Sequence, residues 1–162
     1  MTDTPDAIIK TIQLKASQDR VWCAITDSSE FGQWFGCRFD GPFIAGQAMA
    51  GRMTPTVVND EIAEMQKPYD GHPFNIVIDR IEPQTVFAFR WHPYAVDEGK
   101  DYSGEAETLV TFLLMPADGG THLTITESGF HQLPPERRAQ AFASNEGGWE
   151  AQIHMVEAWL AR

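Results

Sequence analysis

The stretch that decides the fold is residues 134–160, PPERRAQAFASNEGGWEAQIHMVEAWL. Two prolines followed by Glu136 are typical of a first helical turn, because proline needs no N–H donor there and a carboxylate favours the positive end of the helix dipole. Such a start, followed by an apolar stripe, predicts one long helix that faces a sheet. The stripe recurs at steps of three and four: Phe142, Asn145, Trp149, Ile153, Val156 and Leu160.

Two consecutive glycines, Gly147 and Gly148, interrupt the good helix formers of this stretch. Each disfavours the helix by about 0.5–1 kcal/mol relative to alanine. The pair indicates either a close approach of another group to the helix backbone or a simple bend or tolerated defect. The sequence leaves both interpretations open.

Upstream, one strand and two short helices are expected. Residues 8–14, IIKTIQL, alternate as a strand does, and Ser17 then offers an N-cap hydroxyl with Asp19 in the first turn. Asp27 followed by Glu30 resembles a capping box that begins a second helix. The apolar residues of the two helices are Val21, Trp22, Ile25, Phe31, Trp34 and Phe35.

Between residues 39 and 130 the sequence changes to short β-type segments separated by turn residues. Residues 51–58 are a plausible strand that Pro55 makes an edge or interrupted one. Adjacent strands with short links indicate an antiparallel meander, so the predicted class is α+β. The stronger segments are 74–81, 86–91, 107–115 and 122–127.

The composition indicates a single domain spanning residues 1–162. The chain is 43% hydrophobic and has no repeat or linker, and 12 Lys+Arg against 23 Asp+Glu give a net charge of −11. This balance argues against nucleic acids and anionic membranes as partners. We expect a cytoplasmic protein, because the N-terminus lacks a leader pattern and no apolar run approaches the roughly 20 residues that span a bilayer. Cys23 and Cys37 are expected to be buried or half-buried free thiols.

Glu127 is the one acidic residue that the sequence pattern puts on an apolar strand face. It alternates with Leu123 and Ile125, so it faces the helix if they do. One hypothesis makes it a cavity acid or ligand anchor near Asn145; the other makes it a strand-end residue that pairs with an arginine or accepts N–H bonds. Asn145 is likewise either a pocket residue or a partner of the sheet or loop backbone.

The strand at residues 86–91 has two different faces. Arg90 and His92 lie on one face, where they could bind a carboxylate or polarise a carbonyl, and aromatic residues lie on the other. Hydrophobicity favours the aromatic face inside, which would leave Arg90 and His92 in solvent. The aromatic residues are Phe87, Phe89 and Trp91.

No metal or cofactor is predicted. The five histidines have no ligand spacing, and the chain has no G-x-S-x-G, P-loop or G-x-G-x-x-G motif. The histidines are His72, His92, His122, His131 and His154.

The order of these elements resembles the SRPBCC (START-like) superfamily, and within it the bacterial AHSA1-like relatives of the C-terminal domain of the Hsp90 ATPase activator. The resemblance runs from about Ile8 to Leu160. It implies a helix-grip fold: a curved antiparallel sheet around the long C-terminal helix, with a cavity closed by the two short helices. The segments that carry it are VWCAITD (21–27), FGQWF (31–35), FRWHP (89–93), ESGF (127–130) and NEGGW (145–149).

The resemblance also implies three functions, in descending order of expectation. The first is binding of a small apolar or amphipathic ligand between sheet and helix, without catalysis. The second is a cyclase or hydrolase with Glu127 as general acid or base, and the third is an Hsp90-type chaperone-interaction module. The expected ligand-binding residues are Trp34, Phe35, Met53, Arg90, His92, Glu127, Asn145 and Trp149. A void lined by Glu127, Asn145 and Trp149 would support the first two, and a filled interior the third.

Overall fold

A computed structural model describes residues 5–95 and 99–162; residues 1–4, on which the expected absence of a leader partly rests, lie outside the described residues. The elements in chain order are β1 (Ala7–Leu14), α1 (Gln18–Thr26), α2 (Ser28–Phe35), β2 (Cys37–Phe39), β3 (Ala48–Met53), α3 (Asp60–Gln66), the 3-10 turn η1 (Lys67–Tyr69), β4 (Pro73–Glu82), β5 (Val86–Trp91), β6 (Thr108–Ala117), β7 (Gly120–Ser128), the 3-10 turn η2 (Phe130–Gln132) and α4 (Pro135–Leu160).

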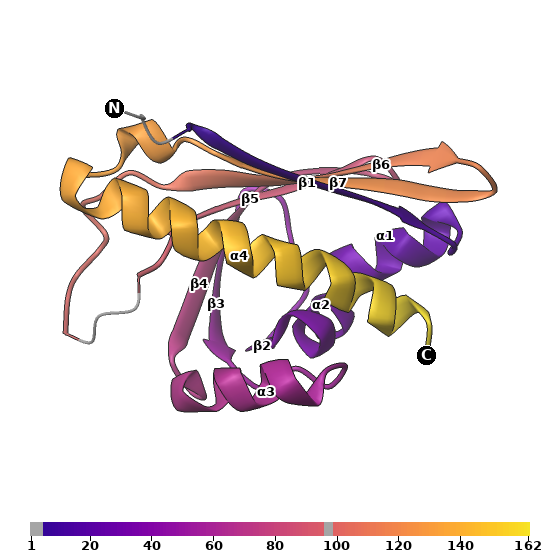
Figure 1. Ribbon diagram of the computed structural model, residues 1–162, viewed down its shortest axis with the longest axis horizontal. Coiled ribbons are helices and arrows are strands. Elements are labelled where there is room, and N and C mark those ends of the chain that lie inside the picture. Colours follow the sequence, from indigo (N-terminus) through magenta and orange to yellow (C-terminus); the bar gives the residue numbers. More distant parts are fainter. Residues whose placement is uncertain (1–4, 96–98) are drawn as a thin grey trace.

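The strands form one antiparallel seven-stranded sheet in the order β1-β7-β6-β5-β4-β3-β2. Helix α4 lies along one face of this sheet, and α1 and α2 lie near the C-terminal half of α4 (Figure 1). In Figure 1, β3 and β4 turn away from the direction of β1, β6 and β7. A register shift between Ile78 and Arg80 lies on β4, as expected where a strand bends. The predicted α+β helix-grip architecture is therefore confirmed.

Both short helices begin at the predicted caps. The Ser17 hydroxyl accepts a hydrogen bond from the Arg20 backbone N–H, and the Asp27 carboxylate accepts two from Ser29 and Glu30. These bonds satisfy N–H groups that a helix start leaves without partners. Helix α2 then ends at Gly36, whose φ of 97° lies in the left-handed region that glycine favours.

The region after Met53 differs from the sequence prediction. The strand expected over residues 51–58 is instead β3, which ends before Pro55 and lies between β2 and β4 rather than at the sheet edge. The unpredicted helix α3 follows, capped by Asn59, whose side chain accepts from Ile62 N–H. It escaped prediction because it is only seven residues long and packs against the core through the partly buried Ile62, which is too little to set an apolar period.

The core lies between the sheet and the helices. Phe31 and Trp34 of α2 are fully buried and pack against Phe87, Phe89 and Phe112 of the sheet. The α4 stripe faces the same core, with its buried members Trp149, Ile153 and Val156.

The two cysteines form no disulfide. Cys37 is buried, as expected, and burial raises the pKa of its thiol. Cys23 is exposed, so the expectation of burial is wrong for this residue. It lies on the solvent side of α1, between Trp22 and the buried Ala24.

Candidate ligand-binding site

Glu127 is a fully buried carboxylate on the helix-facing side of β7. Its relative exposure is 0%, and it alternates with the buried Leu123 and Ile125 as predicted. It lies opposite Ile8 of β1 and Val110 of β6. An acidic side chain in this position requires hydrogen-bond partners, because burial without them is strongly unfavourable.

Four side chains supply those partners. Trp149 Nε1 donates to Oε1 at 2.8 Å, and Asn145 Nδ2 donates to Oε1 and Oε2 at 2.9 and 3.2 Å. Trp91 Nε1 and Thr108 Oγ1 donate to Oε2 at 2.7 and 2.5 Å. We call these five residues, Trp91, Thr108, Glu127, Asn145 and Trp149, the Glu127 cluster.

The donors of the cluster are all neutral. An indole or amide N–H can only donate, so Trp91, Asn145 and Trp149 require an acceptor, which the two carboxyl oxygens of Glu127 provide. None of the ion pairs formed within residues 5–95 and 99–162 includes Glu127. Oriented dipoles, rather than an arginine or lysine, therefore stabilise this buried carboxylate.

Simple periodicities bring the cluster together. Asn145 and Trp149 are four residues apart on α4, so their side chains point from one helix face. Trp91 of β5 lies directly opposite Thr108 of β6, and both face the helix side of the sheet. The cluster therefore joins three neighbouring strands to the middle of α4.

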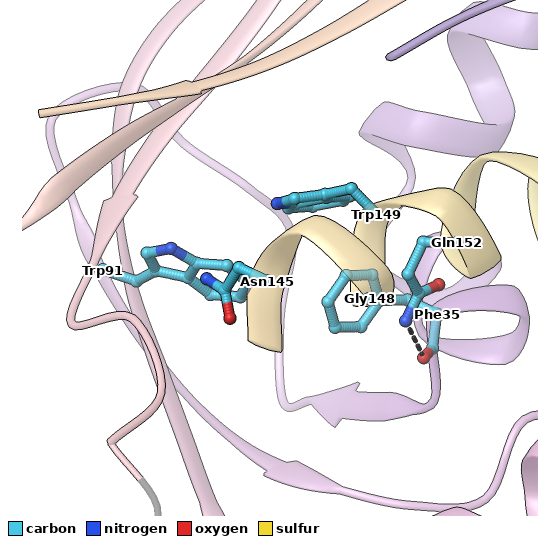
Figure 2. Close-up of a pocket in the computed structure, with 6 residues that line it drawn as sticks. All are labelled: Phe35, Trp91, Asn145, Gly148, Trp149 and Gln152. Carbon is cyan, nitrogen blue, oxygen red and sulfur yellow. Dashed lines mark hydrogen bonds between the residues drawn. The ribbon is translucent and has the colours of Figure 1, made fainter. Parts of the chain in front are cut away.

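A pocket of about 80 Å³ adjoins the cluster (Figure 2). Three aromatic rings form most of its wall: the Trp91 and Trp149 centroids are 5.8 Å apart, and that of Phe35 is 6.3 and 5.9 Å from them. The pocket therefore combines apolar ring faces with a few polar atoms. Its lining residues are Phe35, Trp91, Asn145, Gly148, Trp149 and Gln152.

Gln152 contributes a polar atom without a partner. Its Nε2 donates to the Phe35 carbonyl oxygen at 3.0 Å, as the dashed line in Figure 2 shows. Its Oε1 is buried and accepts no hydrogen bond from any described residue. Buried acceptors are normally paired, so Oε1 is an unsatisfied atom beside the pocket rather than part of its accessible surface.

The helix backbone is open at the paired glycines. Gly148 lines the pocket, and a Cβ added at Gly147 or Gly148 would meet no other atom within 4 Å. The close approach suggested by the sequence is therefore not present. Gly148 is exposed, so the pocket reaches the surface there.

Comparison with known proteins places this chain in a family. A family model described as "Activator of Hsp90 ATPase homolog 1-like protein" matches residues 15–161. The chain belongs to this AHSA1-like family. A comparison with curated proteins finds no significant sequence match.

Several solved structures share the AHSA1-like fold. A protein from Arthrobacter aurescens is 20% identical, with a TM-score of 0.74 over 98% of this chain and 90% of the other. A Mesorhizobium loti protein is also 20% identical, with a TM-score of 0.69 over 96% and 97%. DynU16, described as a protein in the dynemicin biosynthetic locus, is 24% identical, with a TM-score of 0.67 over 98% of this chain but only 48% of DynU16. At these identities the likeness is one of fold.

Only some of the predicted ligand-binding residues of this AHSA1-like chain lie at the pocket. Phe35, Asn145 and Trp149 line the pocket, and Glu127 lies behind it. Trp34 is instead a core residue, fully buried, whose Nε1 donates to the Ala24 carbonyl at 2.8 Å.

Met53 and the polar face of β5 also lie apart from the pocket. Met53 is half-buried on β3, opposite Cys37 of β2. Arg90 pairs with Asp79 and Glu107, and His92 Nε2 lies 3.1 Å from the Glu105 carbonyl oxygen. Phe87 and Phe89 are fully buried, so the expectation that the aromatic face points inward is confirmed. Arg90 and His92 are half-buried rather than fully in solvent as expected.

Four participants were not among the predicted site residues: Trp91 and Thr108 in the cluster, and Gly148 and Gln152 in the pocket. A signal existed for two of them. Thr108 alternates with the apolar Val110 and Phe112, which marks a polar residue on the inward face. Gln152 follows Trp149 by three residues and so shares its helix face.

The pocket is smaller than the predicted cavity, and its lining includes Asn145 and Trp149 but not Glu127, so it is not the predicted void lined by all three. Ligand sites for drug-sized molecules usually measure about 300–1,000 Å³, whereas this one measures about 80 Å³. Large side chains fill the rest of the space between sheet and helices, chiefly Phe31, Trp34 and Phe112. A larger hollow of about 330 Å³, lined by residues 40–42, 44 and 47–50, has no aromatic wall.

Within residues 5–95 and 99–162, no group of three or more His, Cys, Asp and Glu side chains is placed to hold a metal ion. In the same part of the chain, no helix has the length and apolar character needed to cross a membrane.

Proposed function

We propose that this protein binds a small amphipathic molecule in the pocket formed by Phe35, Trp91 and Trp149. The observation that carries the proposal is a pocket walled by the rings of Phe35, Trp91 and Trp149, with the polar side chains of Asn145 and Gln152 in its lining. The apolar part of the ligand would lie on the rings, and a polar group of the ligand would bind the side chain of Asn145 or Gln152. Apolar walls with a few oriented polar groups are typical of small-molecule sites.

The volume of the pocket limits what enters it. One water molecule needs about 10–15 Å³ by this kind of measure, so a pocket of about 80 Å³ admits a group of several heavy atoms. The ligand is therefore either compact or inserts only one end. Gly148, exposed at the mouth and without a side chain, leaves room for the remainder.

The geometry favours binding over catalysis by Glu127. A general acid or base must come within hydrogen-bond reach of the reacting proton. Glu127 is fully buried, is not a lining residue, and uses both oxygens to accept bonds from the cluster. Its role in this proposal is to hold Trp91, Asn145 and Trp149 in the orientation that forms the wall.

A pair of glycine variants tests the proposal. Gly148→Leu fills the pocket from the open helix position, and Gly147→Leu puts the same side chain on the adjacent position, which does not line the pocket. We expect benzyl alcohol or benzamide at millimolar concentration to bind the wild type and Gly147→Leu, measured by saturation-transfer NMR. Gly148→Leu should lose the signal. An equal signal in both leucine variants, or none in the wild type, would overturn the proposal.

A further inference from the structure

We infer that the pocket selects a compact cation, such as a primary or quaternary ammonium group, over a neutral molecule of the same shape. The inference rests on the proposed function and adds the charge of the ligand. It starts from the Glu127 carboxylate, which lies behind the pocket and has no ion-pair partner among the described residues.

The two indole rings connect this carboxylate to the pocket. Trp91 and Trp149 each donate Nε1–H to Glu127, at 2.7 and 2.8 Å, and each also lines the pocket. An indole face is already negative because of its quadrupole, and cations bind within about 6 Å of the ring centre. Donation of the indole N–H to a carboxylate shifts electron density into the ring, which makes the ring face more negative. The wall that a ligand meets therefore favours positive charge.

The other groups in the pocket lining either favour positive charge as well or have no preference for charge. The pocket lining includes no charged side chain, and its polar members are the neutral amides of Asn145 and Gln152. Phe35 adds a third ring face. No group in the lining would compete with a bound cation for the aromatic faces.

The basic side chains on neighbouring elements do not cancel this preference for positive charge. Lys10 of β1 is paired with both Glu146 and Glu150 of α4. Arg137 is paired with Glu105. Arg138 has no ion-pair partner among the described residues, but it precedes Asn145 by seven residues, which is about 10 Å along the helix axis.

The experiment compares choline with 3,3-dimethylbutanol, which has the same shape but a neutral carbon in place of the charged nitrogen. Binding to the wild type is measured by isothermal titration calorimetry, with Gly148→Leu as the filled pocket and Gly147→Leu as its control. We expect choline to bind about tenfold more tightly than dimethylbutanol, with both affinities lost only in Gly148→Leu. Equal or tighter binding of the alcohol would overturn the inference and leave the proposed function standing.

If neither choline nor dimethylbutanol binds, the cation inference is also overturned. The proposed function is decided separately, by the NMR measurement with benzyl alcohol and benzamide. A second variant, Glu127→Gln, addresses the source of the selectivity. In folded protein it should lower choline affinity by about tenfold and change dimethylbutanol affinity by less than about twofold. The wild-type comparison needs no variant, so the inference is testable even if Glu127→Gln does not fold. Equal losses for the two molecules in folded Glu127→Gln would contradict it.

Discussion

Trp149 on α4 donates its indole N–H to Glu127 on β7 at 2.8 Å, across the interface between helix and sheet. Both residues are buried, so water does not replace this bond when it is lost. The same carboxylate accepts from Trp91 and Thr108 on two further strands. The interface therefore has a polar centre inside an aromatic core, and its stability depends on complete pairing of that centre.

Glu127→Gln is expected to destabilise the fold although it preserves the shape of the side chain. A glutamine offers one acceptor oxygen and one NH₂ group, so one of the two indole N–H groups would face another donor. A buried donor left unpaired costs about 1–3 kcal/mol. The free energy of unfolding, measured by urea denaturation, should fall by about that amount.

Glu157→Gln is the matched control for this substitution. Glu157 is exposed on α4, and its carboxylate lies 3.7 Å from His154. Exposed pairs of this kind contribute about 0–1 kcal/mol, so the free energy of unfolding should change little. If Glu127→Gln were no more destabilising than Glu157→Gln, the buried cluster would not have the structural role described.

Much of this site follows from sequence periodicity. Alternation along β7 predicts that Glu127 faces inward, and the three-and-four spacing of α4 puts Asn145 and Trp149 on one face. The pairing of Glu127 with Trp91 does not follow, because it depends on the register between β5, β6 and β7. The pocket volume does not follow either, since the rotamers of Phe35 and Trp149 decide how much space remains.

Two helical glycines should respond in opposite ways to alanine. A Cβ at Gly32 of α2 would lie 2.2 Å from the Cys37 carbonyl oxygen, whereas a Cβ at Gly147 of α4 meets nothing within 4 Å. Gly32→Ala should lose about 1–3 kcal/mol through overpacking. Gly147→Ala should gain about 0.5–1 kcal/mol from helix propensity. Thermal unfolding of both variants checks the prediction, and the same sign for both would contradict it.

The sequence contained no comparable signal for Gly32 or for α3. Gly32 lies inside FGQWF, where its neighbours indicate a helix, and only the return of the chain through Cys37 brings a carbonyl oxygen close to it. Helix α3 has no fully buried residue, and its partly buried Ile62 alone sets no period to detect. Contacts made by chain reversal and short elements with little core contact are thus the parts that sequence periodicity does not predict.

The two cysteines should differ in reactivity. Cys23 is exposed, while Cys37 is buried and its thiol pKa is raised by burial. Because the thiolate is the reactive form, native protein should react with an aromatic disulfide reagent at Cys23, and at Cys37 only after unfolding in urea. A Cys23→Ser variant should show almost no reaction in the native state. Rapid reaction of that variant would mean that Cys37 is accessible.

The ion pairs at Lys10 should make part of the stability depend on pH. Lys10 of β1 contacts both Glu146 and Glu150 of α4, and its pKa is raised by hydrogen bonds to Glu146 and then Glu150. Lys10 in turn lowers the pKa of Glu150 below its ordinary value of 4.5. A lowered acid pKa contributes stability above that ordinary value, and the contribution is lost as the pH falls through the folded-state pKa.

The raised pKa of Lys10 has the opposite sign. Its contribution is complete below the ordinary value of 10.5 and is lost as the pH rises through the folded-state pKa. Lys10→Met should therefore lower the melting temperature slightly at neutral pH, and the difference from wild type should shrink as the pH falls below the ordinary Glu150 pKa of 4.5 and through its lowered folded-state value. Lys15→Met is the control, because Lys15 is exposed and forms no ion pair within the described residues. A difference for Lys10→Met that stayed constant or grew in acid would show that its ion pairs do not connect β1 to α4 energetically.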